Sequence, residues 1–211
     1  MKLRTLTVGP VSCNCGIVAC PATGEAAIID PGGNPERILA EVKAMGVTVK
    51  LLLHTHAHFD HILATGEVAE ATGASILLHR NDQALYENLP GQGRLFGFWA
   101  KSPPAPTQWL EGGEIITIGQ LSAQVVHTPG HTPGSVGYYF GPTEALLFSG
   151  DTLFAESVGR TDLPGGSHDQ LAASIRTKLY VLPGETRVIP GHGADTTIGH
   201  EREHNPFVTA G

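Results

Sequence analysis

The chain has 211 residues, 41% of them hydrophobic and 16% charged, a composition typical of a globular domain long enough to bury a core. Its formal net charge of −7 and the lack of any basic run argue against a general nucleic-acid surface. No apolar stretch has the length of a signal peptide at the start or of a membrane span later, so we expect a cytoplasmic protein that acts on a small molecule and binds no membrane.

The first half of the chain alternates predicted strands and helices. Short runs rich in apolar residues predict strands over residues 3–8, 16–19, 26–29, 49–53 and 75–78. Helical spacing of apolar residues predicts helices over residues 35–45, 60–72 and 81–88. Gly46 and Gly73 directly follow the first two helices, where a glycine often ends a helix.

Residues 89–109 predict a long loop rich in proline and glycine, with Phe96, Phe98, Trp99 and Trp109 in it. A loop of this length within a compact domain is often functional. We expect it to form a wall or lid over a pocket, with Phe98 and Trp99 at its tip. The alternative is a surface flap packed on the rest of the domain.

The second half of the chain is rich in strands. Further strands are predicted over residues 114–118, 123–127, 135–140 and 145–149, followed by a helix over residues 168–182. An apolar pair at Val188 and Ile189 then leads into PGHG. Two strand-rich halves, each followed by helix, predict two sheets packed face to face with helices outside. We therefore expect one α/β domain over residues 1–211.

Three cysteines, Cys13, Cys15 and Cys20, lie close together near the N-terminus. They cannot all pair, and their clustering in one predicted strand argues against a disulfide framework. Cys13 and Cys15 lack a second Cys or His pair nearby in the sequence that would complete a thiolate metal site. We expect three buried thiols.

Four of the eleven histidines lie in the segment LLLHTHAHFDH. With the aspartate among them they form the pattern His56, His58, Asp60 and His61, and imidazole and carboxylate at this density are typical metal ligands. The preceding apolar run, 49–53, predicts a buried strand that delivers the ligands at its carboxyl end. A polar surface loop is the simpler alternative, but it predicts no distant partners.

Three later segments provide such partners. His131 lies in HTPGHTPGS, Asp151 in LLFSGDT and His192 in VIPGHG, each after a predicted strand or at a turn. Glycine and proline flank each of them, which suits tight turns that fix the direction of a side chain. We expect all three to converge with the histidine cluster at one edge of the sheets.

Taken together, THAHFDH, TPGHTPGS, FSGDTLF and PGHG resemble the metallo-β-lactamase superfamily over nearly the whole chain. The resemblance implies a four-layer αββα sandwich. It implies one metal held by His56, His58 and His131, a second held by Asp60, His61 and His192, and Asp151 as the bridge between them. In AIIDPGG it implies that Asp30 supports the site from beneath and is not a ligand.

Two divalent metals roughly 3.5–4 Å apart can share a water and lower its pKa from about 15.7 towards 7. The resulting metal-bound hydroxide is the expected nucleophile, and the metals also polarise the substrate carbonyl. Asp151 and Asp60 are the catalytic residues that we expect, with Asp60 also orienting the hydroxide. Zinc is the metal that we expect, although iron and manganese suit the same ligands.

Within the superfamily, VGRTDLPGG and ERxxNPF resemble the small relatives of glyoxalase II, which hydrolyses hydroxyacylglutathione thioesters such as S-lactoylglutathione. Larger members add a C-terminal helical domain that binds glutathione, which we do not expect here. Arg160 stands where those members have a lysine for the glutathione carboxylate, which implies substrate binding; an ion pair with Asp162 is the alternative. The family has a tyrosine after the last metal histidine, but this chain has Ala194 at that position. The resemblance therefore implies thioester hydrolysis more than glutathione recognition.

The main alternative is a persulfide dioxygenase, a relative with a similar GRTD segment, in which His56, His131 and Asp151 would hold one iron. A β-lactamase or lactonase also stays open, because the fold does not decide the substrate. We leave five histidines out of the site, since they lie outside the motifs: His54, His79, His168, His200 and His204. His127 is expected to pack at a strand end, where it can orient a neighbour.

Overall fold

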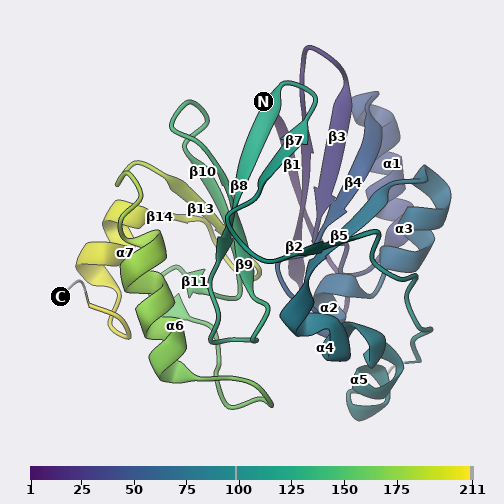
Figure 1. Ribbon diagram of the computed structural model, residues 1–211. Helices are drawn as coiled ribbons and strands as arrows, with labels where there is room; N and C mark the ends of the chain where they lie inside the picture. The colour runs from purple at the N-terminus through teal and green to yellow at the C-terminus, as the bar shows by residue number, and fades with distance from the viewer. Residues whose placement is uncertain (98, 210–211) are drawn as a thin grey trace.

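Two six-stranded sheets lie face to face in the computed structural model, which describes residues 1–97 and 99–209 (Figure 1). The first sheet contains, in order, β1 (Lys2–Val8), β2 (Cys13–Ala19), β3 (Glu25–Ile29), β4 (Thr48–Leu53), β5 (Ser75–His79) and β6 (Gln108–Leu110). The second contains β14 (Thr196–Thr197), β13 (Arg187–Pro190), β10 (Leu146–Gly150), β9 (Val136–Phe140), β8 (Leu121–His127) and β7 (Ile115–Ile118). A small hairpin pairs β11 (Leu153–Phe154) with β12 (Ser157–Val158).

Helices cover the outer faces of both sheets (Figure 1). Over the first sheet lie α1 (Pro35–Met45), α2 (Phe59–Ile62), α3 (Thr65–Thr72), the 3₁₀ turn η1 (Arg80–Asp82), α4 (Gln83–Glu87) and α5 (Leu89–Leu95). Over the second lie α6 (His168–Ser174), the π-helical turn η2 (Ile175–Leu179) and α7 (Ile198–His204). The architecture is the predicted αββα sandwich, and the prediction of its fold is confirmed.

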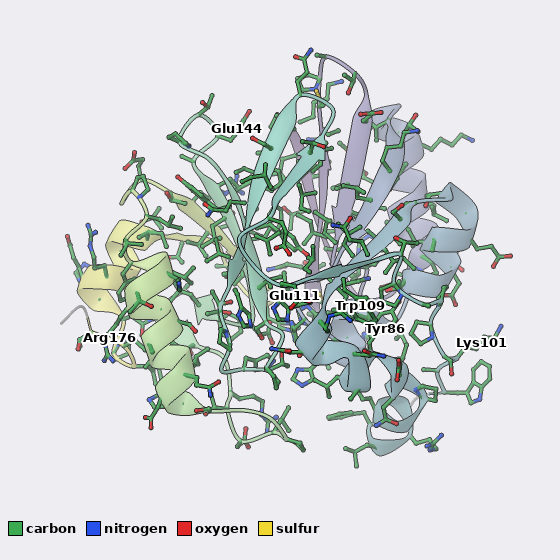
Figure 2. The ribbon with its side chains drawn as sticks, viewed as in Figure 1. Tyr86, Lys101, Trp109, Glu111, Glu144 and Arg176 are labelled. Atoms are coloured by element: carbon green, nitrogen blue, oxygen red, sulfur yellow. The ribbon has the colours of Figure 1, made fainter. Side chains whose placement is uncertain are left out.

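Strand alternation divides the apolar side chains into three layers. On β3, Ile28 packs outward toward the helices while Ile29 packs inward against the second sheet. On β9, Tyr138 faces the inner layer and Tyr139 the outer one, beneath α6. Successive residues of a strand point to opposite faces, so each sheet contributes to two cores. Side chains from both sheets fill the space between them (Figure 2).

The strand directions bring distant parts of the sequence to one edge. Antiparallel pairing of β8 with β9 and of β9 with β10 makes β8 and β10 run the same way, and β13 is parallel to β10. Their carboxyl ends therefore lie on the same side of the second sheet. The metal-ligand motifs follow these strands, so the topology gathers them at that edge.

Two helices in the structure differ in extent from those predicted from the sequence. The predicted helix over residues 60–72 is two helices, because the N–H of Ala64 donates to the carbonyl of Pro31, 2.9 Å away, instead of continuing the helix. The helix predicted over residues 168–182 ends at Leu179 after a π-helical turn. The short elements α7, β11, β12 and β14 are not predicted from the sequence.

The prediction of a loop over residues 89–109 is wrong in part. This segment begins with helix α5 and ends in strand β6. Pro90 lies in the first turn of α5, where a missing N–H does not interrupt the helix. The Gln92 side chain accepts from the N–H of Phe59 and donates to the carbonyls of Ala57 and Leu85. Trp99 is 81% exposed, and Phe98, predicted at the loop tip beside it, lies outside the described residues.

All three cysteines are free and buried, as expected. None of the helices in the described part of the chain is both long and apolar enough to span a membrane.

Ile29 and Ile115 provide a test of the inner core. Ile29 is fully buried between the sheets, whereas Ile115 is 60% exposed at the edge strand β7. We expect Ile29→Ala to lower the free energy of unfolding by about 2–5 kcal/mol, because it leaves a cavity. Ile115→Ala should change it by about 0.5 kcal/mol or less. Equal effects in denaturant unfolding would contradict the assigned packing.

Candidate metal centre

The structure brings all seven predicted ligands together at the carboxyl ends of strands from both sheets. His56 and His58 lie in the loop after β4, and Asp60 and His61 begin the short helix α2. His131, Asp151 and His192 follow β8, β10 and β13. Among the described residues, ligand atoms within 4.8 Å of one another form the groups His56, His58 and His131; Asp60, His61 and His192; and His56, His61 and Asp151.

The first group consists of three imidazole rings set edge to face. The ring centroid of His131 lies 4.7 Å from that of His56 and 4.6 Å from that of His58. Nδ1 of His58 is 2.8 Å from Nε2 of His131. Three ring nitrogens thus face a common point, which is the donor set of a histidine-rich metal site.

The second group combines two imidazoles with a carboxylate. Nε2 of His61 lies 3.3 Å from Nε2 of His192. Asp60 Oδ2 is 3.1 Å from the His192 nitrogen and 3.5 Å from that of His61. The second predicted ligand set is therefore assembled beside the first.

Asp151 lies between the two groups. Its Oδ1 is 3.4 Å from Nε2 of His61, and its Oδ2 is 3.5 Å from Nε2 of His131. Oδ1 thus faces the second group, while Oδ2 lies between His131 of the first group and His192 of the second, 3.8 Å away. This arrangement fits a carboxylate that bridges two ions.

Hydrogen bonds behind the rings orient four of the five histidines. Nδ1 of His131 is 2.7 Å from the carbonyl of Arg160, and Nδ1 of His192 is 3.2 Å from the carbonyl of Ser12. A carbonyl can only accept, so each Nδ1 donates to it, and each Nε2 is left directed toward the site. His56 Nδ1 contacts the Thr55 hydroxyl, and His61 Nδ1 contacts the Asp30 carboxylate.

Asp30 supports the histidine loop from beneath. Its carboxylate accepts from the N–H and the hydroxyl of Thr55, at 2.7 and 2.6 Å, and lies 3.0 Å from Nδ1 of His61. The residue is buried and has a φ of 51°, a conformation that is costly for aspartate and is often found at functional sites. Its position agrees with the supporting role that the resemblance implies.

Asn14 is a supporting residue that the sequence patterns do not reveal. Its side-chain amide donates to the carbonyls of Pro190 and Gly193, at 3.0 and 2.9 Å. These two residues flank the turn that carries His192. The first hairpin therefore fixes the loop of the last ligand.

The two groups differ in their electrostatics. Burial, followed by the neighbouring histidines, lowers the pKa of His56 well below its usual value and that of His58 to about 3. These rings are neutral at pH 7, which is the form that binds metal. Burial also opposes a charge on His61, but Cys13, Asp151 and Asp60 outweigh it and raise the pKa of this ring.

Two buried ligand atoms have no hydrogen-bond partner among the described residues, namely Nε2 of His56 and Oδ1 of Asp151. Buried polar atoms are nearly always paired, because an unpaired one has lost its contacts with water. His56 and Asp151 also belong to one group whose ligand atoms lie within 4.8 Å of one another. A divalent cation there would satisfy both atoms, so the donor set fits the metal ions implied by the sequence.

Gly191 allows this close approach. A Cβ atom at this position would overlap Oδ1 of Asp151 and lie 2.7 Å from Cε1 of His61. Any side chain here would displace the Asp151 carboxylate. The close packing of the predicted ligands therefore requires a glycine at position 191.

The structure places Arg160 in the ion pair considered as the alternative. Its guanidinium donates two hydrogen bonds to the Asp162 carboxylate, at 2.7 and 2.8 Å, and both side chains are exposed. Its backbone carbonyl contacts His131, so the residue lies beside the first group. Substrate binding by its side chain stays a prediction.

The histidines left out of the site have other contacts. His54 points away from it, with Nε2 3.4 Å from the Thr65 hydroxyl, and burial lowers its pKa to about 4. His79 stacks on His127 at 4.1 Å, and Nε2 of His127 is 3.0 Å from the carbonyl of Pro133 in the His131 loop. His168, His200 and His204 are exposed.

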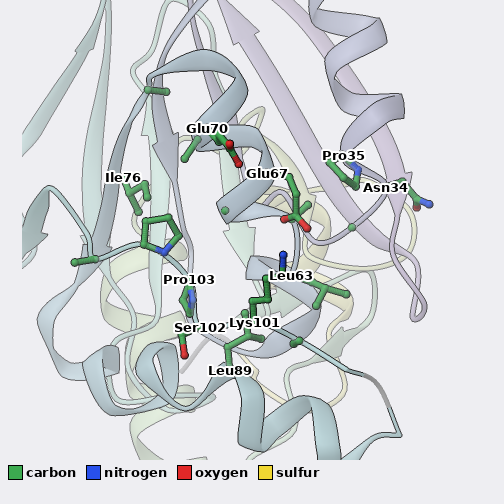
Figure 3. A pocket seen from close by; sticks show the side chains of 18 of the residues that line it. Asn34, Pro35, Leu63, Glu67, Glu70, Ile76, Leu89, Lys101, Ser102 and Pro103 are labelled. Carbon is green, nitrogen blue, oxygen red and sulfur yellow. The ribbon is translucent and has the colours of Figure 1, made fainter.

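A large pocket lies elsewhere, on the outer side of the first sheet. Its volume is about 920 Å³, and α3 and residues 99–105 contribute much of its lining. Glu67 and Glu70 stand on α3, while Lys101 and Pro103 come from the facing segment (Figure 3). None of the seven predicted ligands lines it. This pocket is therefore separate from the candidate metal centre.

Comparisons with known proteins agree with this geometry. The profile of the Metallo-beta-lactamase superfamily matches residues 8–192. The chain is 36% identical to Hydroxyacylglutathione hydrolase GloC of Haemophilus influenzae, covering 100% of this chain and 99% of the relative. It is 40% identical to Probable metallo-hydrolase YqgX of Bacillus subtilis, covering 99% and 98%.

Solved structures are similar as well. The crystal structure of BLEG-1 B3 metallo-beta-lactamase has a TM-score of 0.92 and 41% identity, covering 99% of this chain and 100% of that one. TTHA1623 in a di-iron-bound form has a TM-score of 0.89 and 42% identity, covering 97% and 100%. ETHE1 from Myxococcus xanthus has a TM-score of 0.82 and 32% identity, covering 98% and 84%.

We expect Gly191→Ala to weaken metal binding by about 10–100-fold, because the added methyl group displaces Asp151. Gly141→Ala is the matched control, since a Cβ there has no atom within 4 Å. Competition of each metal-loaded protein with a chromophoric chelator measures the affinity. Equal metal affinity in the two variants would contradict the role given to Gly191.

Proposed function

The chain belongs to the metallo-beta-lactamase superfamily, and from this premise we propose that it is a metal-dependent hydrolase of acyl thioesters, with hydroxyacylglutathione thioesters as substrates. One observation carries the hydrolase proposal. The Asp151 carboxylate lies between the two histidine groups and contacts rings of both, which is an arrangement suited to two adjacent ions. No serine or cysteine nucleophile is needed at such a centre.

The thioester part of the proposal is supported by the likeness to GloC. The match extends over 99% of that relative, which is named as a hydroxyacylglutathione hydrolase. We infer the same reaction class for this chain.

The residues divide into two proposed ion sites. His56, His58 and His131 would hold the first ion, Asp60, His61 and His192 the second, and Asp151 would contact both. When bound, two such ions lower the pKa of a shared water and polarise a substrate carbonyl. We propose zinc for both sites; the di-iron form of TTHA1623 makes iron the alternative to measure.

Asp60 has a second role in this proposal. Burial acts to raise its pKa, but His61 and His192 bring it well below the usual range, so the group is an ionised acceptor at neutral pH. One oxygen contacts His192. The carboxylate can therefore accept a hydrogen bond from the attacking water and hold it in line. The leaving thiol has a pKa of about 8.5, so it departs as thiolate without a strong general acid.

Two other activities remain to be separated from this one. A β-lactam substrate is suggested by the likeness to BLEG-1. An iron-dependent persulfide dioxygenase would use His56, His131 and Asp151, which the structure also places close together. These activities differ in substrate and in their use of oxygen, so one panel of assays distinguishes them.

We expect the purified protein to hydrolyse S-lactoylglutathione with two metal ions bound, and Asp151→Ala to reduce turnover to background while losing metal. Asp169→Asn, an exposed change on α6, should leave both unchanged. Steady-state kinetics and metal analysis measure the two effects. Rapid oxygen uptake with glutathione persulfide by a protein with one iron, or turnover of a β-lactam alone, would refute the thioesterase proposal.

Arg160 allows a separate test of glutathione recognition. If its guanidinium binds a substrate carboxylate, Arg160→Gln should raise the KM for S-lactoylglutathione by roughly two- to fivefold, as expected for an exposed ion pair, with kcat unchanged. Asp162→Asn should leave KM the same or lower it, because it frees the guanidinium. Equal increases in both variants would indicate that only their mutual ion pair matters.

A further inference from the structure

A buried carboxylate outside the predicted ligand set lies behind the first histidine group. Asp82 ends the 3₁₀ turn η1 after strand β5, in a segment that carries no predicted ligand. Its side chain is fully buried. A carboxylate rarely occupies such a position unless other groups hold it there by hydrogen bonds.

Three donors from two ligand loops converge on this carboxylate. The N–H of Ala57, between His56 and His58, donates to Oδ2 at 2.9 Å. The Thr132 hydroxyl donates to the same oxygen at 2.8 Å, and the N–H of Gly134 donates to Oδ1 at 2.6 Å. Asp82 therefore joins the loop of the first two histidines to the loop that carries His131.

The fit around Asp82 is close. A Cβ atom at Gly134 would lie 2.6 Å from the carboxylate carbon, nearer than such atoms approach one another, so glycine is required there. Hydrogen bonds to an ionised acceptor are about twice as strong as neutral ones. Replacing the carboxylate by an amide would leave at least one buried N–H without a partner, because an amide cannot accept at both of its ends.

A backbone hydrogen bond also joins these two segments, below the loops. The N–H of Val136 donates to the carbonyl of Thr55 at 2.8 Å and joins the strand ends of the two sheets. This bond precedes His56 and follows His131 in the chain. It fixes where the His56 loop begins and where the His131 loop ends, whereas Asp82 bonds to the ligand-bearing segments themselves.

We propose that Asp82 is a positioning residue for the first metal site. It holds the backbone on either side of the histidine group so that His56, His58 and His131 face one point. This inference rests on the proposed metal centre, but it does not depend on which substrate the centre acts on.

Asp82→Asn is the direct test. With the protein loaded with Co²⁺, we expect affinity at the first site to fall by about 10–100-fold, the range found for partners that orient metal ligands. The visible absorption of the bound Co²⁺ should shift as well, because the ligand geometry changes. Chelator competition measures the affinity, and the spectrum of the fully loaded protein reports the geometry.

Glu201→Gln is the matched control. Glu201 is also a fully buried carboxylate with three donors, the N–H of Glu156, the Thr196 hydroxyl and the Asn205 amide, but it lies on α7 away from the ligands. Both variants should be less stable in denaturant. Only Asp82→Asn should alter Co²⁺ affinity and spectrum.

Thr132→Val keeps the test valid if Asp82→Asn does not fold. It removes one of the three hydrogen bonds and should change the Co²⁺ affinity in the same direction by a smaller factor. Wild-type affinity and spectrum in the folded variants, or equal changes in Glu201→Gln, would overturn the proposal. Failure of the thioesterase proposal would instead appear as absent turnover in a wild-type protein that binds Co²⁺ normally.

Discussion

The contact of one carboxylate with two groups of imidazoles is the constraint on which the rest of this structure depends. Asp151 can face His61 with one oxygen and His131 with the other only if loops from both sheets meet at one edge. The parallel course of β8, β10 and β13 brings three of these loops together. The loop after β4 in the first sheet completes the set.

Such a site works against the stability of the fold, because it gathers buried polar groups where apolar packing would be favourable. The molecule compensates with three apolar layers around the sheets and with buried acids behind the ligands. Asp30 holds Thr55 and His61 in the loop after β4, and Asp82 joins the two loops of the first group. Each acid is itself satisfied by several donors, whereas His56 Nε2 and Asp151 Oδ1 are among the buried atoms of the described residues that have no hydrogen-bond partner.

The sandwich and the convergence of the seven candidate ligands are predictable from the sequence because strand patterns and four motifs, which together resemble the metallo-β-lactamase superfamily, indicate both. Alternating apolar strands and flanking turns define the sheets, and the ligands lie just beyond the strand ends. Helix α5 is not predictable in this way, since LPGQGRL has the composition of a loop and is held as a helix by Gln92. Asp82 is equally hidden, because its partners are 25, 50 and 52 residues away in the chain and no motif surrounds it.

The measurement that tests the two-ion centre most directly is anomalous X-ray diffraction from crystals of the metal-loaded protein. Two peaks are expected, one within bonding distance of His56, His58 and His131 and the other of Asp60, His61 and His192, with Asp151 contacting both. A single ion held by His56, His131 and Asp151, or peaks away from these residues in a fully active enzyme, would contradict the account.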